Sequence, residues 1–422
     1  MSDLPRLTAE QTAERLGVKR ETLYAYVARG LLTRERTAAG SSFDPLEVEA
    51  FASARRRSAA PAPARSEGRP LMVIETDFAL IDDGELYYRG RPAAELAREP
   101  FEVVAHWALT GRWEASVRFA PGAGLDAARR VADALPPGAG DRDRQLVAVT
   151  ALAAADPLRT SLDPEAVAGA AERLIAGMVA VLPLKSAPAG PALAGELWSR
   201  LSPQPPSAEA LRTLDAALVL LLDHDLAVST LAARAAASAR ATPYAVVVAG
   251  LGALDSPLHG NASRAAHRML ARVAAGEEPA RVVADAVVDG RGPVPGFGQP
   301  LYPVGDPRAR ILLGMLAGIP GAEPVVAAVD ALAALLRDRT GAAPNVDLAL
   351  AALSLTAGMP DDAGEVIFAT ARTAGWIVHA LAEYREPPLR LRPVGRYTPP
   401  RGGGCGGGAP PPDGGRKGGG GA

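Results

Sequence analysis

Residues 207–222 read SAEALRTLDAALVLLL, and this stretch predicts an amphipathic α-helix. Ser207 can cap the first turn, Glu209 lies within that turn, and apolar residues recur at helical spacing. Similar Ala- and Leu-rich stretches, separated by Pro and Gly, follow one another along most of the chain, and alternating β-branched runs are few. The sequence therefore predicts a mainly α fold.

Length and composition predict more than one folded unit. The chain has 422 residues, 48% of them apolar, which is more than one hydrophobic core usually organises, so we expect two or three domains. Lys and Arg number 45 against 47 Asp and Glu. Because the charges balance, the chain as a whole has no basic field, and any binding of nucleic acid would be local.

Two breaks in composition mark segments that we do not expect to pack. Residues 55–70, RRRSAAPAPARSEGRP, read as a linker, and residues 401–422 read as a disordered tail rich in Gly and Pro. Before the body, residues 74–90 predict a hairpin that turns at Asp83-Gly84.

The expected location is the cytoplasm. No apolar run reaches signal-peptide length at the N-terminus or the roughly 20 residues of a membrane span, so we expect no membrane partner. Cys405, the one cysteine, lacks a partner for a disulfide or a thiolate metal site.

Residues 7–30, LTAEQTAERLGVKRETLYAYVARG, predict two short helices. Thr8 is a candidate cap for the first, Gly17 reverses the chain, and the second begins near Lys19. Its start exposes the side chains that a recognition helix would present to duplex DNA, which are Lys19, Arg20, Thr22 and Tyr24. With GLLTRER following, this stretch resembles the winged helix-turn-helix of the MerR and excisionase families. The alternative is a helical hairpin that mediates protein assembly.

The body lacks the common phosphate-loop, HExxH, paired CxxC and dinucleotide-binding motifs. Five histidines occur in the chain, and two lie in distinctive settings, His224 in LLLDHDLAVST and His259 in DSPLHGNAS. His259 would lie close to a helix N-terminus, where the dipole disfavours imidazolium and favours a neutral hydrogen-bond donor. Further candidates follow in GFGQPLYPVGDPRAR (Gln299, Arg308), PNVDLAL (Asp347), ARTAGWIVH (Arg372) and LRLRPVGRYTPP (Arg392).

In these motifs the chain resembles the citrate synthase family, whose members typically read DHE.NAST, GPLHGGAN, GFGHR.Y...DPRA, PNVDF, RTxGW and RPR..Y. The order and approximate spacing agree over about residues 72–400. The resemblance implies a mainly helical dimer with a large and a small domain. It also implies condensation of acetyl-CoA or a short acyl-CoA with oxaloacetate, followed by thioester hydrolysis to citrate and CoA, a step of the tricarboxylic acid cycle.

The resemblance assigns a role to each candidate. Asp347 is the base that takes a proton from the thioester methyl, and His259 is the neutral donor to the enolate oxygen. His224 holds the oxo acid, Arg308 and Arg372 clamp its two carboxylates, and Arg392 reaches in from the neighbouring subunit. No metal or redox cofactor is implied, since acetyl-CoA is a substrate.

Each residue taken alone has a simpler explanation. Asp347 could merely cap a helix, each histidine could be a satisfied structural residue, and the arginines could be solvated surface charges. The occurrence of all these residues in family order favours the active site.

Three departures bear on activity. Gln299 stands where the family has the histidine that polarises the oxo-acid carbonyl, and it can donate a hydrogen bond but cannot become cationic. Losing such an interaction costs on the order of 10²-fold or more. Asn261 replaces a glycine, and Val394 replaces the second arginine of RPR.

We therefore predict a winged helix-turn-helix over 1–54, a large domain over 71–260 and 377–400, and a small domain over 261–376. The predicted function is that of a citrate-synthase-type acyltransferase. The alternative is a catalytically weakened paralogue that senses a metabolite and regulates DNA binding.

Overall fold

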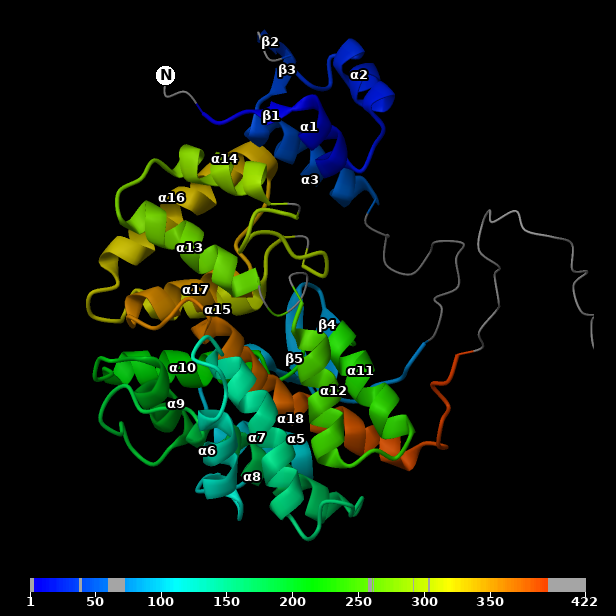
Figure 1. Cartoon of the computed structure of the whole chain (residues 1–422), viewed down its shortest axis with the longest axis vertical. Helices are drawn as coiled ribbons and strands as arrows, with labels where there is room; N and C mark the ends of the chain where they lie inside the picture. The colour runs from blue at the N-terminus through cyan, green and yellow to red at the C-terminus, as the bar shows by residue number, and fades with distance from the viewer. Residues whose placement is uncertain are drawn as a thin grey trace, which may run out of the picture. The chain divides into compact units, whose positions relative to one another are not determined.

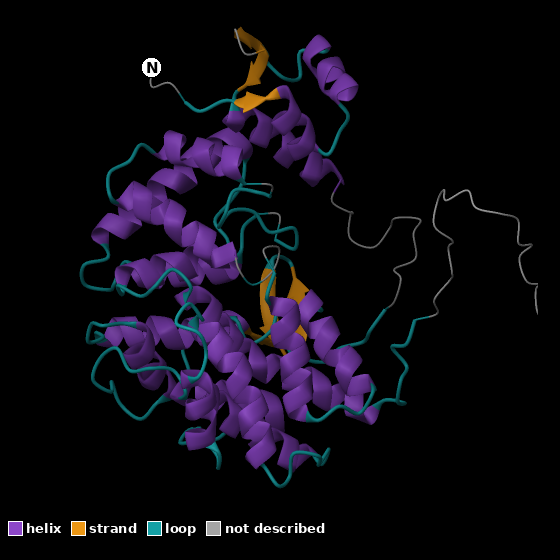
Figure 2. Cartoon of the chain, in the orientation of Figure 1, coloured by secondary structure: helices purple, strands orange, loops and turns teal. Residues whose placement is uncertain are grey.

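The computed structural model describes residues 4–37, 40–59, 73–256, 260, 262–290, 292–302 and 304–393. The chain divides into two units, Met1–Arg390 and Leu391–Ala422. In the second unit, the described residues 391–393 form no helix or strand. Helices dominate the first unit (Figures 1 and 2), so the mainly α prediction is confirmed. The predicted tail, Cys405 and most of the predicted linker lie outside the described residues.

The N-terminal segment combines short helices with a small antiparallel sheet. It contains β1 (Leu7–Thr8), α1 (Ala9–Leu16), α2 (Arg20–Ala28), β2 (Glu35–Thr37), β3 (Gly40–Phe43) and α3 (Pro45–Ala59), with strand order β1-β3-β2. Thr8 and Gln11 form a capping box at α1, and Gly17 ends that helix in the left-handed conformation. Both local predictions are confirmed. Helix α3 continues five residues beyond the predicted end of the module.

The predicted hairpin is also confirmed. Strands β4 (Ala79–Asp82) and β5 (Glu85–Tyr88) pair in antiparallel fashion, and β6 (Arg91–Pro92) extends the sheet. Asp83 and Gly84 both have positive φ, 47° and 76°, as a tight two-residue turn of this kind requires. Behind it, Tyr88 is buried and its hydroxyl donates to backbone carbonyls at the end of α10 and beyond, including that of Asp223 at 3.0 Å.

The body is built from helices joined by short connections. In chain order, the first are α4 (Ala93–Leu96), α5 (Phe101–Thr110), α6 (Leu125–Asp133), α7 (Asp141–Ala155), α8 (Pro164–Ala180), α9 (Leu193–Leu201), α10 (Ala208–Leu220), α11 (Val228–Ser238) and α12 (Pro243–Leu254). The others are α13 (Ala262–Ala274), α14 (Pro279–Asp289), α15 (Pro307–Leu316), α16 (Glu323–Thr340), α17 (Val346–Thr356) and α18 (Ala363–Arg385). Helix α10 confirms the prediction for 207–222, and the Ser207 side chain accepts from the amide of Ala210.

Helix α18 is the centre of the body. Every residue from Ala363 to Ala380 is buried, and the helix packs against α5, α7, α8, α10, α11 and α12 (Figure 1). The boundary predicted between residues 376 and 377 falls inside this continuous helix. The division into a large and a small domain stays a prediction.

Helices α13 to α17 pack against one another, and α3 of the N-terminal segment packs on α14 and α16. Arg15 of α1 makes the polar part of this contact, and its side chain is only 5% exposed. Its guanidinium donates to the carbonyls of Val287 and Gly290 at 2.8 Å each, to the carbonyl of Gly292 at 2.9 Å, and to Glu49. All five N–H donors of Arg15 are used, because Nε also donates to Glu49.

Gly375 permits the close approach of α18 to the segment that follows α10. A Cβ at this position would collide with the carbonyl oxygen of Leu222. Gly252, on an exposed face of α12, has nothing within 4 Å of such a Cβ. Both glycines lie inside helices, but only Gly375 is packed too closely to accept a side chain.

We expect Gly375→Ala to lower the free energy of unfolding by about 1–3 kcal/mol, because backbone on both sides must shift. The matched substitution Gly252→Ala should raise the free energy of unfolding by about 0.5–1 kcal/mol, since alanine is the better helix former. Denaturant unfolding of the two variants measures the contrast, and equal effects would contradict the packing argument.

Candidate active site

The loop that carries Gln299 is hydrogen-bonded to the segment at the start of α17. The amide of Gly298 donates to the carbonyl of Ala343 at 2.8 Å, and the Asn345 side-chain amide donates to the carbonyl of Gly298 at 3.0 Å. The Asn345 amide donates to Gly296, whose φ of +80° and contact with Leu348 leave no room for a side chain. Two motifs distant in sequence are therefore held together by backbone hydrogen bonds.

Asp347 lies in the first turn of α17 without being its cap. The cap is Asn345, whose side chain accepts from the Asp347 amide at 3.0 Å. The Asp347 carboxyl is thus not needed for capping, and the simpler explanation for it is wrong. The pKa of Asp347 is raised to about 6. Burial is the main cause, Arg308 opposes the rise, and Asp306 adds to it. A carboxylate with a pKa near the operating pH suits a general base.

Arg308 is buried at the start of α15. Asp306 caps this helix and pairs with Arg308 through two contacts, Nε to Oδ1 at 3.0 Å and Nη2 to Oδ2 at 2.8 Å. Asp306 Oδ2 also accepts from the Val346 amide at 3.1 Å, which ties α15 to α17. The same carboxylate therefore fixes Arg308 and the helix that carries Asp347.

Tyr302 and His224 lie next to each other and close to Arg308. Their ring centroids are 5.2 Å apart, and the Arg308 guanidinium lies 5.8 Å from the Tyr302 ring centroid. The Tyr302 hydroxyl is buried and has no hydrogen-bond partner among the described residues. Burial raises the pKa of Tyr302, so its hydroxyl remains a neutral donor at physiological pH.

Arg372 projects from α18 towards the segment after α10. Its Nε donates to the carbonyl of Leu221 at 2.8 Å, and its guanidinium lies 4.8 Å from the Phe368 ring centroid. Nη1 lies 3.9 Å from Asp223 Oδ1 and makes no hydrogen bond within the described part of the chain. Burial lowers the pKa of Arg372, and Asp223 opposes this change. Arg308 and Arg372 are 2% and 1% exposed, so neither is a solvated surface charge.

These side chains act on one another electrostatically. Arg308 and Arg372 both lower the pKa of Tyr302, and Arg308 also lowers that of Asp347. Two buried guanidinium groups, a carboxyl with a raised pKa and a histidine–tyrosine pair therefore share one region. Such a set can hold a dianion beside a base.

The structure describes only some of the other predicted residues. Gln299 is half-buried, and its Oε1 accepts from the Leu301 amide at 3.3 Å within its own loop. His259 and Asn261 lie outside the described residues, and Arg392 belongs to the second unit. Tyr302 and Asp223 were missed as site residues, although both stand within the motifs that carry Gln299 and His224.

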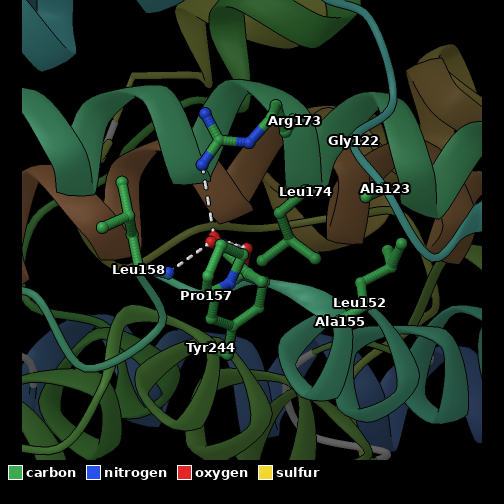
Figure 3. A pocket seen from close by; sticks show the side chains of 10 residues that line it. Gly122, Ala123, Leu152, Ala155, Pro157, Leu158, Arg173, Leu174 and Tyr244 are labelled. Atoms are coloured by element: carbon green, nitrogen blue, oxygen red, sulfur yellow. Dashed lines mark hydrogen bonds and ion pairs between the residues drawn. The ribbon is translucent and has the colours of Figure 1, made fainter.

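A separate cavity of about 250 Å³ shares no lining residue with this region. It is bordered by α7, α8 and α12, with Arg173 and Tyr244 among its lining residues (Figure 3). Asp156, also in its wall, accepts from the Tyr244 hydroxyl at 2.6 Å and from Arg173 at 3.2 Å. Over the described ranges, no group of three or more His, Cys, Asp or Glu side chains could hold a metal ion. Likewise, none of the described helices is long and apolar enough to cross a bilayer.

The fold and the site define a mainly helical protein that is suited to bind an anionic substrate next to a half-buried base. Residues 69–394 match the model of the citrate synthase C-terminal domain. The chain belongs to the citrate synthase family. This confirms the predicted family and its transferase type of chemistry for the body, and the N-terminal segment is not part of the match.

Curated relatives and solved structures agree. Citrate synthase from Deinococcus radiodurans is 29% identical over 355 residues, covering 78% of this chain and 94% of the relative. The match to Haloferax volcanii citrate synthase is 37% identical over 205 residues, 47% of this chain, and spans only 53% of that relative. The structure of Thermotoga maritima citrate synthase aligns with a TM-score of 0.64 at 25% identity, covering 78% of this chain and 94% of that one.

We expect Asp347→Asn to stabilise the protein above about pH 6, because the carboxylate is charged there and its burial costs free energy. The folded pKa is raised above its ordinary value of 3.8, so this cost is fully present above about pH 6, falls as the pH drops from 6, and vanishes only below the ordinary value, where the group is protonated in both states. The gain should be on the order of 1–2 kcal/mol at pH 8, allowing for partial exposure.

Urea unfolding at pH 8 and pH 5 measures this effect. The control is Asp330→Asn on the exposed face of α16, which should change the free energy of unfolding by no more than about 0.5 kcal/mol. A loss of stability at pH 8 in Asp347→Asn would contradict the raised pKa of this carboxyl.

Proposed function

We propose that the chain condenses acetyl-CoA, or another short acyl-CoA, with oxaloacetate and hydrolyses the product to citrate and CoA. The observation that carries this proposal is the carboxyl of Asp347, with its raised pKa, near buried Arg308, which in turn interacts with buried Arg372. Membership of the citrate synthase family supports the reaction type. The solved citrate synthase from Thermoplasma acidophilum, 24% identical with a TM-score of 0.64, contains carboxymethyl coenzyme A and oxaloacetate.

In the proposed reaction, Asp347 removes a proton from the thioester methyl group while His259 donates a hydrogen bond to the enolate oxygen. The enolate carbon attacks the carbonyl carbon of oxaloacetate, and the carbonyl oxygen becomes an alkoxide that takes up a proton. Water then cleaves the thioester bond and releases CoA. Arg308 and Arg372 bind the carboxylates, His224 holds the oxo acid, and Arg392 completes the site of a neighbouring subunit in a homodimer.

Gln299 determines how fast we expect the condensation to be. A glutamine amide can donate to the carbonyl oxygen of oxaloacetate, but it cannot supply the positive charge that would stabilise the alkoxide. The Gln299 Oε1 accepts from the Leu301 amide at 3.3 Å, which leaves the side-chain amide nitrogen as the group that could donate to the substrate. We therefore expect a slow condensing enzyme, because glutamine lacks the positive charge that would stabilise the alkoxide.

CoA release from acetyl-CoA, with and without oxaloacetate, tests the proposal. The wild type should release CoA only with oxaloacetate, and Asp347→Asn should lower the rate by about 10²–10⁴-fold through loss of the base. Gln299→His should raise the rate by about tenfold or more, because it restores a group that can become cationic. Asp330→Asn is the matched control and should leave the rate unchanged.

Two outcomes of this assay would count against the enzyme. A silent wild type that gains activity from Gln299→His would favour the metabolite-sensing regulator. Silence of both proteins in the presence of oxaloacetate would contradict the condensing reaction itself.

We further propose that the N-terminal segment is a winged helix-turn-helix that binds duplex DNA in the cytoplasm. At the start of α2, Lys19 and Arg20 are exposed and Thr22 and Tyr24 are half-buried, which suits a recognition helix. The Arg34 guanidinium lies 5.8 Å from the Tyr24 ring centroid and adds positive charge to this face. The contacts of Arg15 with residues 287–292, just before the Gln299 loop, favour communication between this segment and the site.

A gel-shift titration with random duplex DNA tests the DNA proposal. Charge reversal at Lys19 and Arg20 to Glu should weaken binding more than tenfold and reduce its salt dependence by about two phosphate contacts. The control reverses exposed Arg98 and Arg159, which lie in the body, and should bind as the wild type does. Absence of salt-dependent binding by the wild type would favour the assembly module.

A further inference from the structure

A row of buried charged side chains continues from Arg372 through its neighbours on α11, α18 and the segments that flank them. Its members come from α11, α18 and the flanking segments, and all but the last are at most 2% exposed in their side chains. In order of contact they are Arg372, Asp223, His379, Arg234, Glu383 and Arg390. The proposed reaction gives no role to the five residues after Arg372.

His379 is the central link of this row. Its Nε2 lies 2.8 Å from Asp223 Oδ2, and its Nδ1 lies 3.1 Å from Arg234 Nη1. A guanidinium can only donate, so His379 Nδ1 must accept from Arg234 and carries no proton. The imidazole proton is therefore on Nε2, which donates to Asp223. Arg234 thus selects the tautomer of His379 that can hold the aspartate.

Glu383 fixes Arg234 in turn. Arg234 donates to Glu383 Oε2 from Nε at 3.2 Å and from Nη2 at 2.9 Å. From the opposite side, Arg390 donates to Glu383 Oε1 at 2.8 Å and to Oε2 at 2.7 Å. With both oxygens of Glu383 engaged, neither Arg234 nor His379 can turn without breaking several charge-assisted hydrogen bonds.

Asp223 forms a long ion pair with Arg372 but no hydrogen bond to it. One of its oxygens, Oδ2, is taken by His379, while Oδ1 stays 3.9 Å from Arg372 Nη1 and accepts no hydrogen bond from the described residues. Burial raises the pKa of Asp223, but His379 and Arg372 outweigh burial and leave the pKa below its ordinary value. The group is therefore a carboxylate that could close on Arg372 if it were released.

We propose that His379 is a positioning residue that restrains Asp223 and thereby keeps Arg372 Nη1 open for a carboxylate of the dianionic substrate. Arg234 and Glu383 act through His379 by fixing its tautomer and orientation. The inference rests on the proposed function only in that Arg372 binds a dicarboxylate. It requires binding and not turnover, so it applies equally to an enzyme and to a sensor.

The physical reason is competition between two carboxylates for one guanidinium. A bidentate Asp223–Arg372 pair in this buried setting would have to be broken before substrate could bind. The hydrogen bond from His379 holds the competitor about 1 Å beyond hydrogen-bond distance, which leaves Arg372 desolvated and ready to bind. Loss of the His379 donor should therefore weaken oxaloacetate binding and leave the chemical step largely unchanged.

The test compares two amide substitutions that differ by one methylene. In His379→Asn the short amide can still accept from Arg234 but cannot reach Asp223, whereas in His379→Gln the longer amide can donate to Asp223. Oxaloacetate titration of the full chain by calorimetry should show about tenfold weaker binding for His379→Asn and less than about threefold for His379→Gln. In the CoA-release assay, KM for oxaloacetate should rise in parallel while kcat changes less than about threefold.

A second substitution separates positioning from general damage to the fold. Adding Asp223→Asn to His379→Asn removes the competing charge and should restore oxaloacetate affinity to within about threefold of the wild type. The single variant Asp223→Asn should bind oxaloacetate at least as tightly as the wild type. This comparison does not depend on how well the histidine variants fold. Thermal unfolding of each variant reports on folding.

Several results would overturn the proposal. These are wild-type affinity in His379→Asn, equal losses in the Asn and Gln variants, failure of Asp223→Asn to restore binding, or weaker binding by Asp223→Asn alone. A wild type that binds no oxaloacetate overturns both this inference and the enzyme. Binding without CoA release overturns the enzyme alone.

Discussion

The contact between α18 and the segment after α10 is the constraint on which the site depends. Because Gly375 lacks a side chain, α18 approaches the Leu222 carbonyl closely enough for Arg372 to donate to Leu221. The same approach brings Asp223 beside Arg372. A helix that is buried on all sides normally carries apolar residues, so buried Arg372 and Glu383 need partners from neighbouring segments, and they find them in Leu221 and Arg234.

Much of the fold could be predicted from the sequence, because its signals are local. The Thr8 cap, the Gly17 terminus, the Asp83-Gly84 turn and the helix after Ser207 each depend on a few neighbouring residues. The side chains expected to clamp a dianion are likewise buried together, and they could be found because each lies in a recognisable motif. Local signals cannot show which distant segments meet, as at Gly375.

The row of charged residues behind Arg372 could not be predicted for the same reason. His379 and Glu383 lie on one helix, but their partners Asp223 and Arg234 come from segments about 150 residues away. Nothing in the sequence near His379 indicates which nitrogen carries its proton. That choice is made by Arg234, and it becomes visible only when the distances to both ring nitrogens are known.

Arg15 also has a consequence for how this chain can be dissected. It satisfies three backbone carbonyls at the end of α14, so a shortened chain that begins after the linker would leave those acceptors to water and uncover the apolar faces of α14 and α16. The body cut free would therefore differ from the body of the intact chain at the base of the Gln299 loop. The N-terminal segment is better regarded as a structural subunit of the catalytic body than as a detachable accessory.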